Sequence, residues 1–173
     1  MPYYFGYGSN MSTSYLERVR GVSPSRSTAT ILHDYQLVMN LKGPNFIEPS
    51  FANISYSKGA KVEGIVHEVE QIDLDRIIAS EGETYEIIEA PVDLDGSEVV
   101  ACTLKSTEEL SEDRPASRRY MKILIKAAID NGLSSEYIVK LKKKKSVYYP
   151  LLSEIFAIRV YLWVSRRARN KCV

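Results

Sequence analysis

Two short stretches of this 173-residue chain combine residue types that could bind an anion and move a proton. The first is YFGYGSNM at residues 4–11, where an aromatic strand breaks on two glycines and continues into small polar residues. A strand that runs into glycines and then into a helix directs unpaired backbone N–H groups into the turn, and such turns bind oxyanions and carboxylates. Gly6 and Gly8 permit either a positive φ or the close approach of a ligand. The alternative is a tight turn that only closes a sheet.

The second stretch is Ser80-Glu81-Gly82, which follows an expected helix and precedes an expected strand. A carboxylate in such a place can act as a general base if it is partly buried, because burial raises the pKa of carboxyl groups toward the working pH. Glu81 is therefore the candidate base. The alternative is a solvated loop glutamate beside Glu83, because loops usually run over the surface.

Other common catalytic arrangements are missing from the sequence. His33 and His67 are its only histidines, and neither lies near a serine or cysteine in a recognisable nucleophile elbow, so both are expected to be ordinary strand residues. The sequence contains no CxxC, no HExxH and no carboxylate cluster with metal spacing, which predicts no metal site. Gly6 and Gly8 lack the third glycine and the lysine of a nucleotide-binding fingerprint.

Alternating and β-branched segments predict a sheet that would position these two stretches. We expect hairpins at Lys58-Gly59 and Asp95-Gly96, since such dipeptides favour tight turns between strands. The expected strands cover residues 3–7, 52–56, 61–69, 85–94 and 99–104, with another within 28–41.

Helical periodicity appears between and after the strands. A short helical segment is expected over residues 16–20 and a longer helix over 72–80. The clearest helix covers 117–130, with apolar residues at three- and four-residue spacing. Ser134 can cap a further helix that runs through Leu141. Hairpins with inserted helices indicate an α+β fold.

Composition narrows the class of protein. The chain has 23 Lys and Arg against 22 Asp and Glu, a net charge of +1, so no overall field would recruit nucleic acid. Cys102 and Cys172 are too few for a disulfide framework, and no signal peptide is visible at the N-terminus. We therefore expect a cytoplasmic protein without a nucleic-acid partner.

The tail differs from the rest of the chain. We expect one domain over residues 1–147 and an extension over 148–173, which is apolar apart from Glu154 and Arg159 and then basic over 166–171. This extension could be a helix or strand packed on the domain or on a second subunit, which would make a homodimer. It could instead contact an anionic membrane surface weakly, or be a disordered end.

Three motifs together resemble the gamma-glutamylcyclotransferase family, also called AIG2-like. Residues 4–11 resemble its N-terminal strand followed by YGSN. Residues 80–82, followed by Tyr85 and a β-prone run, resemble the segment around its catalytic glutamate. YMKI through AA at 120–128, then NGL and EY at 131–137, resemble its late helix and the tyrosine after it.

The resemblance implies a small mixed β-barrel with flanking helices and a polar cavity at its mouth. Glu81 would move protons as general base and acid, and the turn at residues 7–10 would hold the glutamyl end and stabilise an oxyanion. Tyr137 would close the pocket with its hydroxyl. The substrate-binding residues implied by the resemblance are Tyr4, Phe5, Gly6, Tyr7, Gly8, Ser9, Asn10 and Tyr137.

The reaction implied is the cyclisation of a γ-glutamyl group to 5-oxoproline, with release of an amino acid or amine. It needs no cofactor, because nucleophile and electrophile belong to one small-molecule substrate. Such an enzyme could serve glutathione metabolism, or remove a γ-glutamyl cap from a specialised metabolite. A non-catalytic binding protein of the same fold is the other alternative. The loop at 43–50 and the tail from residue 148 match nothing in the family pattern, so the leaving group stays open.

Overall fold

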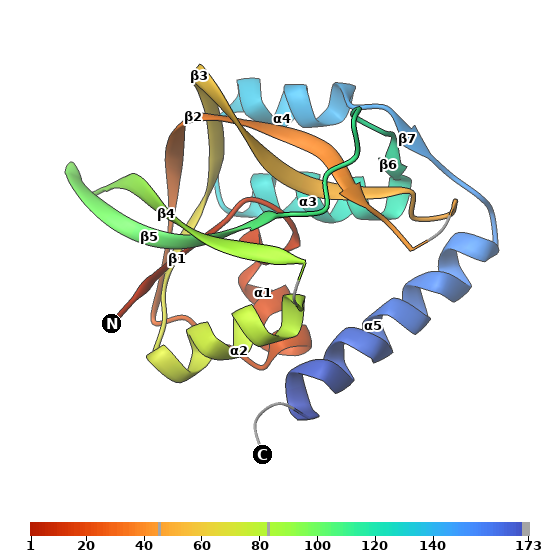
Figure 1. The fold of residues 1–173 in the computed structure, drawn as a ribbon, viewed down its shortest axis with the longest axis horizontal. Coiled ribbons are helices and arrows are strands. Elements are labelled where there is room, and N and C mark those ends of the chain that lie inside the picture. The colour runs from red at the N-terminus through yellow and green to blue at the C-terminus, as the bar shows by residue number, and fades with distance from the viewer. Residues whose placement is uncertain (45, 83, 171–173) are drawn as a thin grey trace.

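The computed structural model describes residues 1–44, 46–82 and 84–170, and a closed five-stranded barrel forms its centre (Figure 1). Glu83, Lys171 and Cys172 lie outside the described residues. The barrel strands, in the spatial order β1-β3-β2-β4-β5, are β1 (Tyr3–Gly6), β2 (Arg26–Lys42), β3 (Ser50–Glu68), β4 (Tyr85–Leu94) and β5 (Ser97–Ser106). The predicted α+β fold with a small mixed barrel is confirmed.

One long hairpin, β2 and β3, forms much of the wall. Its pairing runs antiparallel from Arg26 opposite Glu68 to Lys42 opposite Ser50. The hairpin predicted at Lys58-Gly59 is wrong, because these residues lie inside a continuous β3. Gly59, with φ 79°, sits at an irregularity in the ladder opposite Asp34, which has φ 62°. Asp34 accepts a hydrogen bond from the Gly59 N–H at 2.7 Å, so the turn-forming residues bend the long strand instead of reversing it.

The second hairpin is as predicted. Asp95 and Gly96 both have positive φ and connect β4 to β5. β1 then closes the barrel, because it pairs antiparallel with β3 and in parallel with β5, where Tyr4 lies opposite Cys102. The short β1 leads directly into the turn that carries the first candidate site.

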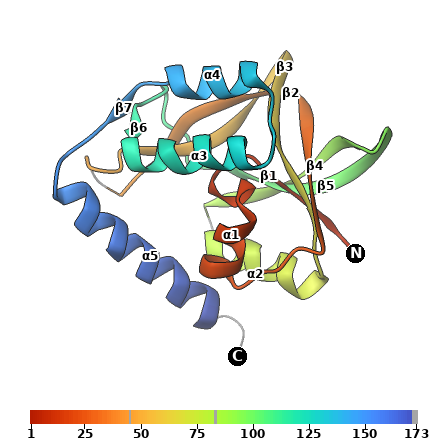
Figure 2. The ribbon, with the colours of Figure 1, turned by 180° about the vertical axis from the view of Figure 1, so that it is seen from behind.

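Helical elements cover both ends of the barrel (Figure 2). The first three of these elements follow β1 within a few residues. Ser117 and Ser134 are the N-caps of α3 and α4, since each accepts a hydrogen bond from the N–H three residues later. The helical elements are η1 (Ser9–Met11), α1 (Thr13–Tyr15), η2 (Leu16–Arg20), α2 (Gln71–Glu81), α3 (Arg118–Asp130), α4 (Ser135–Lys143) and α5 (Leu152–Asn170). A short parallel pair, β6 (Ala116–Ser117) and β7 (Ser146–Val147), flanks α3.

β1 separates two hydrophobic clusters. Successive side chains of a strand point to opposite sides, so Phe5 packs into the main core with α3 and α4 while Tyr4 packs into a smaller one. The smaller cluster joins Leu16 of η2 to Leu74 and Ile77 of α2. The turn after β1 is therefore anchored from both sides.

The tail forms α5, which contacts α2 and η2, so the structure shows a helix packed on the domain (Figure 1). Its outer side leaves Leu152, Ile155, Ile158 and Leu162 exposed. Within the described residues, no helix has the length and apolar character needed to cross a membrane. Contact of this outer side with a second subunit or with a membrane surface stays a prediction.

Candidate active site

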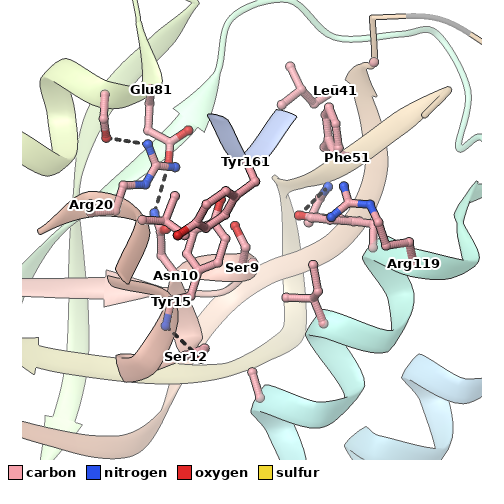
Figure 3. A pocket seen from close by; sticks show the side chains of 18 of the residues that line it. Ser9, Asn10, Ser12, Tyr15, Arg20, Leu41, Phe51, Glu81, Arg119 and Tyr161 are labelled. Atoms are coloured by element: carbon pink, nitrogen blue, oxygen red, sulfur yellow. Dashed lines mark hydrogen bonds and ion pairs between the residues drawn. The ribbon is translucent and has the colours of Figure 1, made fainter. Parts of the chain in front are cut away.

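A cavity of about 1020 Å³ opens between the turn after β1, the end of α2, the start of α3, and α5 (Figure 3). Both candidate stretches line it. It brings Asn10 together with Glu81, although 71 positions separate them in the sequence. The fold therefore joins the two stretches that the sequence singled out into one site.

Asn10 connects the turn to the acid. Its Nδ2 donates to Oε1 of Glu81 at 2.9 Å and to the hydroxyl of Tyr4 at 2.9 Å. Glu81 ends α2, and its side chain is 17% exposed. The guanidinium of Arg20 pairs with the same oxygen, Oε1. Oε2 of Glu81 has no hydrogen-bond partner within residues 1–44, 46–82 and 84–170, so one oxygen is held and the other is available to a ligand.

Arg20 reaches Glu81 from the end of η2. This element ends at Gly21, whose φ of 68° suits the left-handed conformation that closes a helix. The Arg20 side chain is only 4% exposed and also donates to Ser80 Oγ, which in turn donates to the carbonyl of Ile77 at 2.7 Å. A buried guanidinium requires such partners, because an unpaired buried charge is costly. Sequence reasoning placed Arg20 in a helical segment but missed this contact, since nothing local marks a partner 61 positions away.

His67 supports the turn from inside the barrel. The Asn10 carbonyl can only accept, so the Nε2 of His67, 2.9 Å away, carries the hydrogen. The Nδ1 then accepts from the Ser27 hydroxyl at 2.8 Å. Burial lowers the pKa of His67 to about 4, against the opposing effect of the Asn10 carbonyl, so the ring is neutral. His67 is a strand residue as expected, but it also fixes the backbone of Asn10.

The two glycines leave room for neighbouring atoms close to the backbone, and neither adopts a left-handed conformation. Gly8 has φ −110°, and Gly6 is not among the positive-φ residues of the described chain. A Cβ on Gly6 would lie 2.8 Å from the carbonyl oxygen of Asn10, and one on Gly8 would lie 3.2 Å from the Tyr120 hydroxyl. Of the two alternatives for these glycines, the positive φ is wrong. The close neighbours observed are protein atoms, so the close approach of a ligand stays a prediction.

The turn leaves N–H groups for a ligand. In η1 the first internal donors are Met11, which donates to Gly8 O at 3.1 Å, and Ser12, which donates to Ser9 O at 3.2 Å. The N–H groups of Ser9 and Asn10 precede them, so they have no partner inside this turn. Both residues line the cavity.

Several buried tyrosines surround the acid. Tyr7 donates to the carbonyl of Leu104, and the Tyr120 hydroxyl accepts from the N–H of Ala52 at 3.3 Å. Burial raises the pKa of Tyr4, Tyr7 and Tyr120, so these phenols stay neutral. The walls near Glu81 thus combine a few buried hydroxyls with apolar ring surface.

Three residues implied by the resemblance do not line this cavity. Phe5 points into the main core, and Gly6 supports the turn from behind. Tyr137 belongs to the same core, in α4, and its buried hydroxyl has no hydrogen-bond partner in the described part of the chain. The hydroxyl that borders Gly8 is that of Tyr120, one helix earlier. Tyr137 therefore does not border this cavity, and the expected closure of the pocket by its hydroxyl stays a prediction.

A buried carboxylate fixes the opposite wall. Glu48, fully buried in the loop that matched no family pattern, accepts from Ser117 Oγ at 2.7 Å and from Arg119 Nε at 2.8 Å. Ser117 is also the N-cap of α3. The loop thereby holds Arg119 at the edge of the cavity.

Comparisons with known proteins agree with this architecture. A family model described as the AIG2-like family matches residues 61–141. A human gamma-glutamylcyclotransferase is 32% identical over 148 residues, which cover 80% of this chain and 76% of that protein. A gamma-glutamyl cyclotransferase of Aspergillus oryzae is 27% identical over 172 residues, and the match covers 86% of this chain but only 63% of the fungal protein.

Solved structures show the same fold. One of a gamma-glutamyl cyclotransferase superposes with a TM-score of 0.72 at 26% identity, over 86% of this chain and 90% of the other. One of an uncharacterized human protein gives a TM-score of 0.73 at 27% identity, over 85% and 89% of the two chains.

The two glycines of the turn should differ in their tolerance of a methyl group. Gly6→Ala meets backbone atoms, which cannot move alone, so we expect it to lower the free energy of unfolding by about 1–3 kcal/mol. Gly8→Ala meets only the end of the Tyr120 side chain, so its cost should stay within about 0.5 kcal/mol. Urea unfolding of both variants checks this, and an equal or reversed order would contradict the packing described for the turn.

His67 should make stability depend on pH. The unfolded chain protonates this histidine near its ordinary pKa of 6.5, whereas the folded protein does so only at about 4. The unfolded state therefore binds more protons in between, and stability falls as the pH drops from 6.5 toward 4, by about 3 kcal/mol in all.

The measurement is the free energy of unfolding between pH 7.5 and 4.5 for the wild type and His67→Gln. Glutamine can donate to Asn10 and accept from Ser27 without titrating, so its pH slope should be smaller. The exposed His33 provides the matched control, and His33→Gln should keep the wild-type slope. Equal slopes in all three proteins would show that His67 titrates alike in both states.

Proposed function

The chain belongs to the gamma-glutamylcyclotransferase family, and from this premise we propose that it cyclises the γ-glutamyl group of a small molecule to 5-oxoproline and releases an amino acid or amine. One observation carries the proposal. Glu81 has one oxygen fixed by Asn10 and Arg20 and the other without a partner in the described chain, in a cavity also lined by the turn at Ser9. A positioned carboxylate beside backbone N–H donors suits acyl transfer at a carbonyl carbon.

The first step is proton removal. An α-amine is mostly protonated at neutral pH, since the ordinary pKa of such a group is about 7.7–8.0. Oε2 of Glu81 accepts a proton from this ammonium group, and the freed nitrogen attacks the γ-carbonyl carbon of the same molecule. A new carbon–nitrogen bond closes the five-membered ring, and the carbonyl oxygen becomes an oxyanion.

The second step is the collapse of this tetrahedral intermediate. The N–H groups of Ser9 and Asn10 stabilise the oxyanion until its electron pair re-forms the carbonyl and the original amide bond breaks. Glu81 returns its proton to the departing nitrogen, and the second proton that the ring nitrogen must lose to become an amide passes through the same carboxylate to the released amine, which leaves as an ammonium group. No net proton or electron is gained or lost by the protein, and the enzyme mainly supplies orientation.

Arg20 and Asn10 act on the substrate through Glu81. Both donate to Oε1, so the carboxylate cannot rotate freely and Oε2 keeps its direction. The neutral phenols of Tyr4 and Tyr7 exclude water around this pair. Charges interact more strongly in such a dry site than in water.

The alternatives share this site. Removal of a γ-glutamyl cap from a specialised metabolite would use the same two steps with another leaving group. A non-catalytic binding protein would not need a carboxylate at position 81, nor the buried Arg20 that holds it. The ion pair therefore favours an enzyme over a binding module.

Glu81→Gln should abolish most turnover while the fold is retained. Glutamine keeps the shape and the hydrogen bond from Asn10 through its carbonyl oxygen, but it cannot take up a proton. We expect the rate of 5-oxoproline formation to fall by about a hundred- to ten-thousandfold. The control is Glu108→Gln, an exposed carboxylate that lines the same cavity away from this network and should keep near-normal turnover. Normal turnover of Glu81→Gln would remove Glu81 from the mechanism.

The nucleophile should belong to the substrate. An N-acetylated γ-glutamyl dipeptide should be inert, because its amide nitrogen has no available lone pair, whereas a hydrolase would still cleave it. Mass spectrometry of the unmodified reaction in oxygen-18 water gives a second test. Cyclisation yields 5-oxoproline without the label, and labelled free glutamate as first product would instead establish a hydrolase.

A further inference from the structure

The cavity extends well beyond the catalytic network. Its volume of about 1020 Å³ lies at the upper end of the roughly 300–1,000 Å³ typical of pockets that bind drug-sized ligands. The groups that act on the glutamyl part, Asn10 and Glu81 with the turn, line only one end. The leaving group must occupy part of the remaining space, because Glu81 has to reach the departing nitrogen.

One wall of the cavity is aromatic. Phe51, near the start of β3, packs edge-to-face on Tyr120 of α3, with ring centroids 5.0 Å apart. Tyr15 also lines the cavity, and the guanidinium of Arg20 lies over its ring at 5.8 Å from the ring centroid. Leu41 adds an apolar side chain to this wall (Figure 3).

α5 supplies a second aromatic wall. Phe156, Tyr161 and Trp163 all line the cavity, and Figure 3 shows Tyr161 in front of Asn10 and Tyr15. The helix is placed there by its contacts with α2 and η2, the elements that carry Glu81 and Arg20. The aromatic wall and the catalytic pair are thus positioned by the same packing.

These aromatic side chains are incompletely covered. Tyr161 is 50% exposed and Trp163 is 57% exposed, although both border a cavity. Large aromatic side chains gain free energy when apolar surface leaves water, so exposed ones that line a cavity mark a place where a ligand completes the packing. A small leaving group such as alanine would leave this surface in water.

We propose that the leaving group of the substrate carries an aromatic or similarly bulky apolar side chain, which binds between α5 and the wall formed by Tyr15, Phe51 and Tyr120. This inference rests on the proposed cyclisation for its position relative to Glu81. It assigns to the tail, residues 148–170, a role in substrate selection.

Turnover gives the first test. The release of 5-oxoproline is measured for γ-glutamyl-alanine and γ-glutamyl-phenylalanine with the wild-type protein. We expect kcat/KM to be about 10- to 100-fold higher for the phenylalanine compound, since burial of one such side chain has that effect on binding. Equal values would overturn the inference and leave the proposed cyclisation intact.

A matched pair of α5 variants locates the effect. Phe156→Ala should lower kcat/KM for γ-glutamyl-phenylalanine about tenfold and change that for γ-glutamyl-alanine little. Ile155→Ala, on the exposed outer side of the same helix, should leave the ratio of the two substrates unchanged. An equal loss for both substrates in Phe156→Ala would show that α5 only stabilises the fold.

Binding gives a test that does not depend on turnover. Trp163 is the one tryptophan of the chain, so its fluorescence reports on this wall directly. In the Glu81→Gln variant, γ-glutamyl-phenylalanine should shift the emission and saturate at a lower concentration than γ-glutamyl-alanine. Saturable binding without 5-oxoproline from the wild type would support the aromatic site and overturn the cyclisation. The absence of any response to the phenylalanine compound would overturn the aromatic site.

Discussion

The buried contact between Arg20 and Glu81 is the constraint on which the site depends. Neither charge could be buried alone, and removal of one partner from such a pair costs about 3–5 kcal/mol because the other charge is left uncompensated. The contact ties η2 to the end of α2, so two helical elements distant in sequence must pack together. α2 stops there because Gly82, with φ 92°, ends the helix immediately after the acid. The acid is therefore fixed at a helix end, where one oxygen can still face a ligand.

β1 connects the barrel to the pair of Arg20 and Glu81 and holds it in place. Because Phe5 and Tyr4 enter different hydrophobic clusters, the strand cannot rotate without disturbing both. His67 then holds the carbonyl of Asn10, and the side chain of Asn10 holds both Tyr4 and Glu81. A chain of buried hydrogen bonds thus connects the barrel interior to the acid and favours a single geometry, although the buried Asn10 Oδ1 and Arg20 Nε have no hydrogen-bond partner in the described part of the chain.

The sequence predicted the features that depend on neighbouring residues. It did not predict the features that depend on contacts between residues far apart in the chain. The turn at Asp95-Gly96 and the cap at Ser117 act within a few residues, and both were found. The turn residues at Lys58-Gly59 were misinterpreted, because pairing with β2 along the whole length of β3 outweighs the local preference for reversal. In the site, Glu81 and the turn were recognisable by motif. The part played by Arg20 was not, since its partner lies 61 positions away, and Tyr120 could be told from Tyr137 only by how α3 packs.

The polarity of the cavity differs between its barrel side and its α5 side, and this separates the chemistry from the selection of the leaving group. At the barrel end, Arg20 and Asn10 are buried and Glu81 is mostly buried, which suits proton transfer but leaves these groups little room to adapt. On the α5 side, the lining combines aromatic side chains with Arg159 and is partly exposed, so single residues there can change while the packing of α5 on α2 and η2 is kept. Specificity for the leaving group would then reside in the tail, which lies outside the residues 61–141 that the family model matches. Such a division would let one barrel keep its chemistry while the added helix determines which γ-glutamyl compound enters.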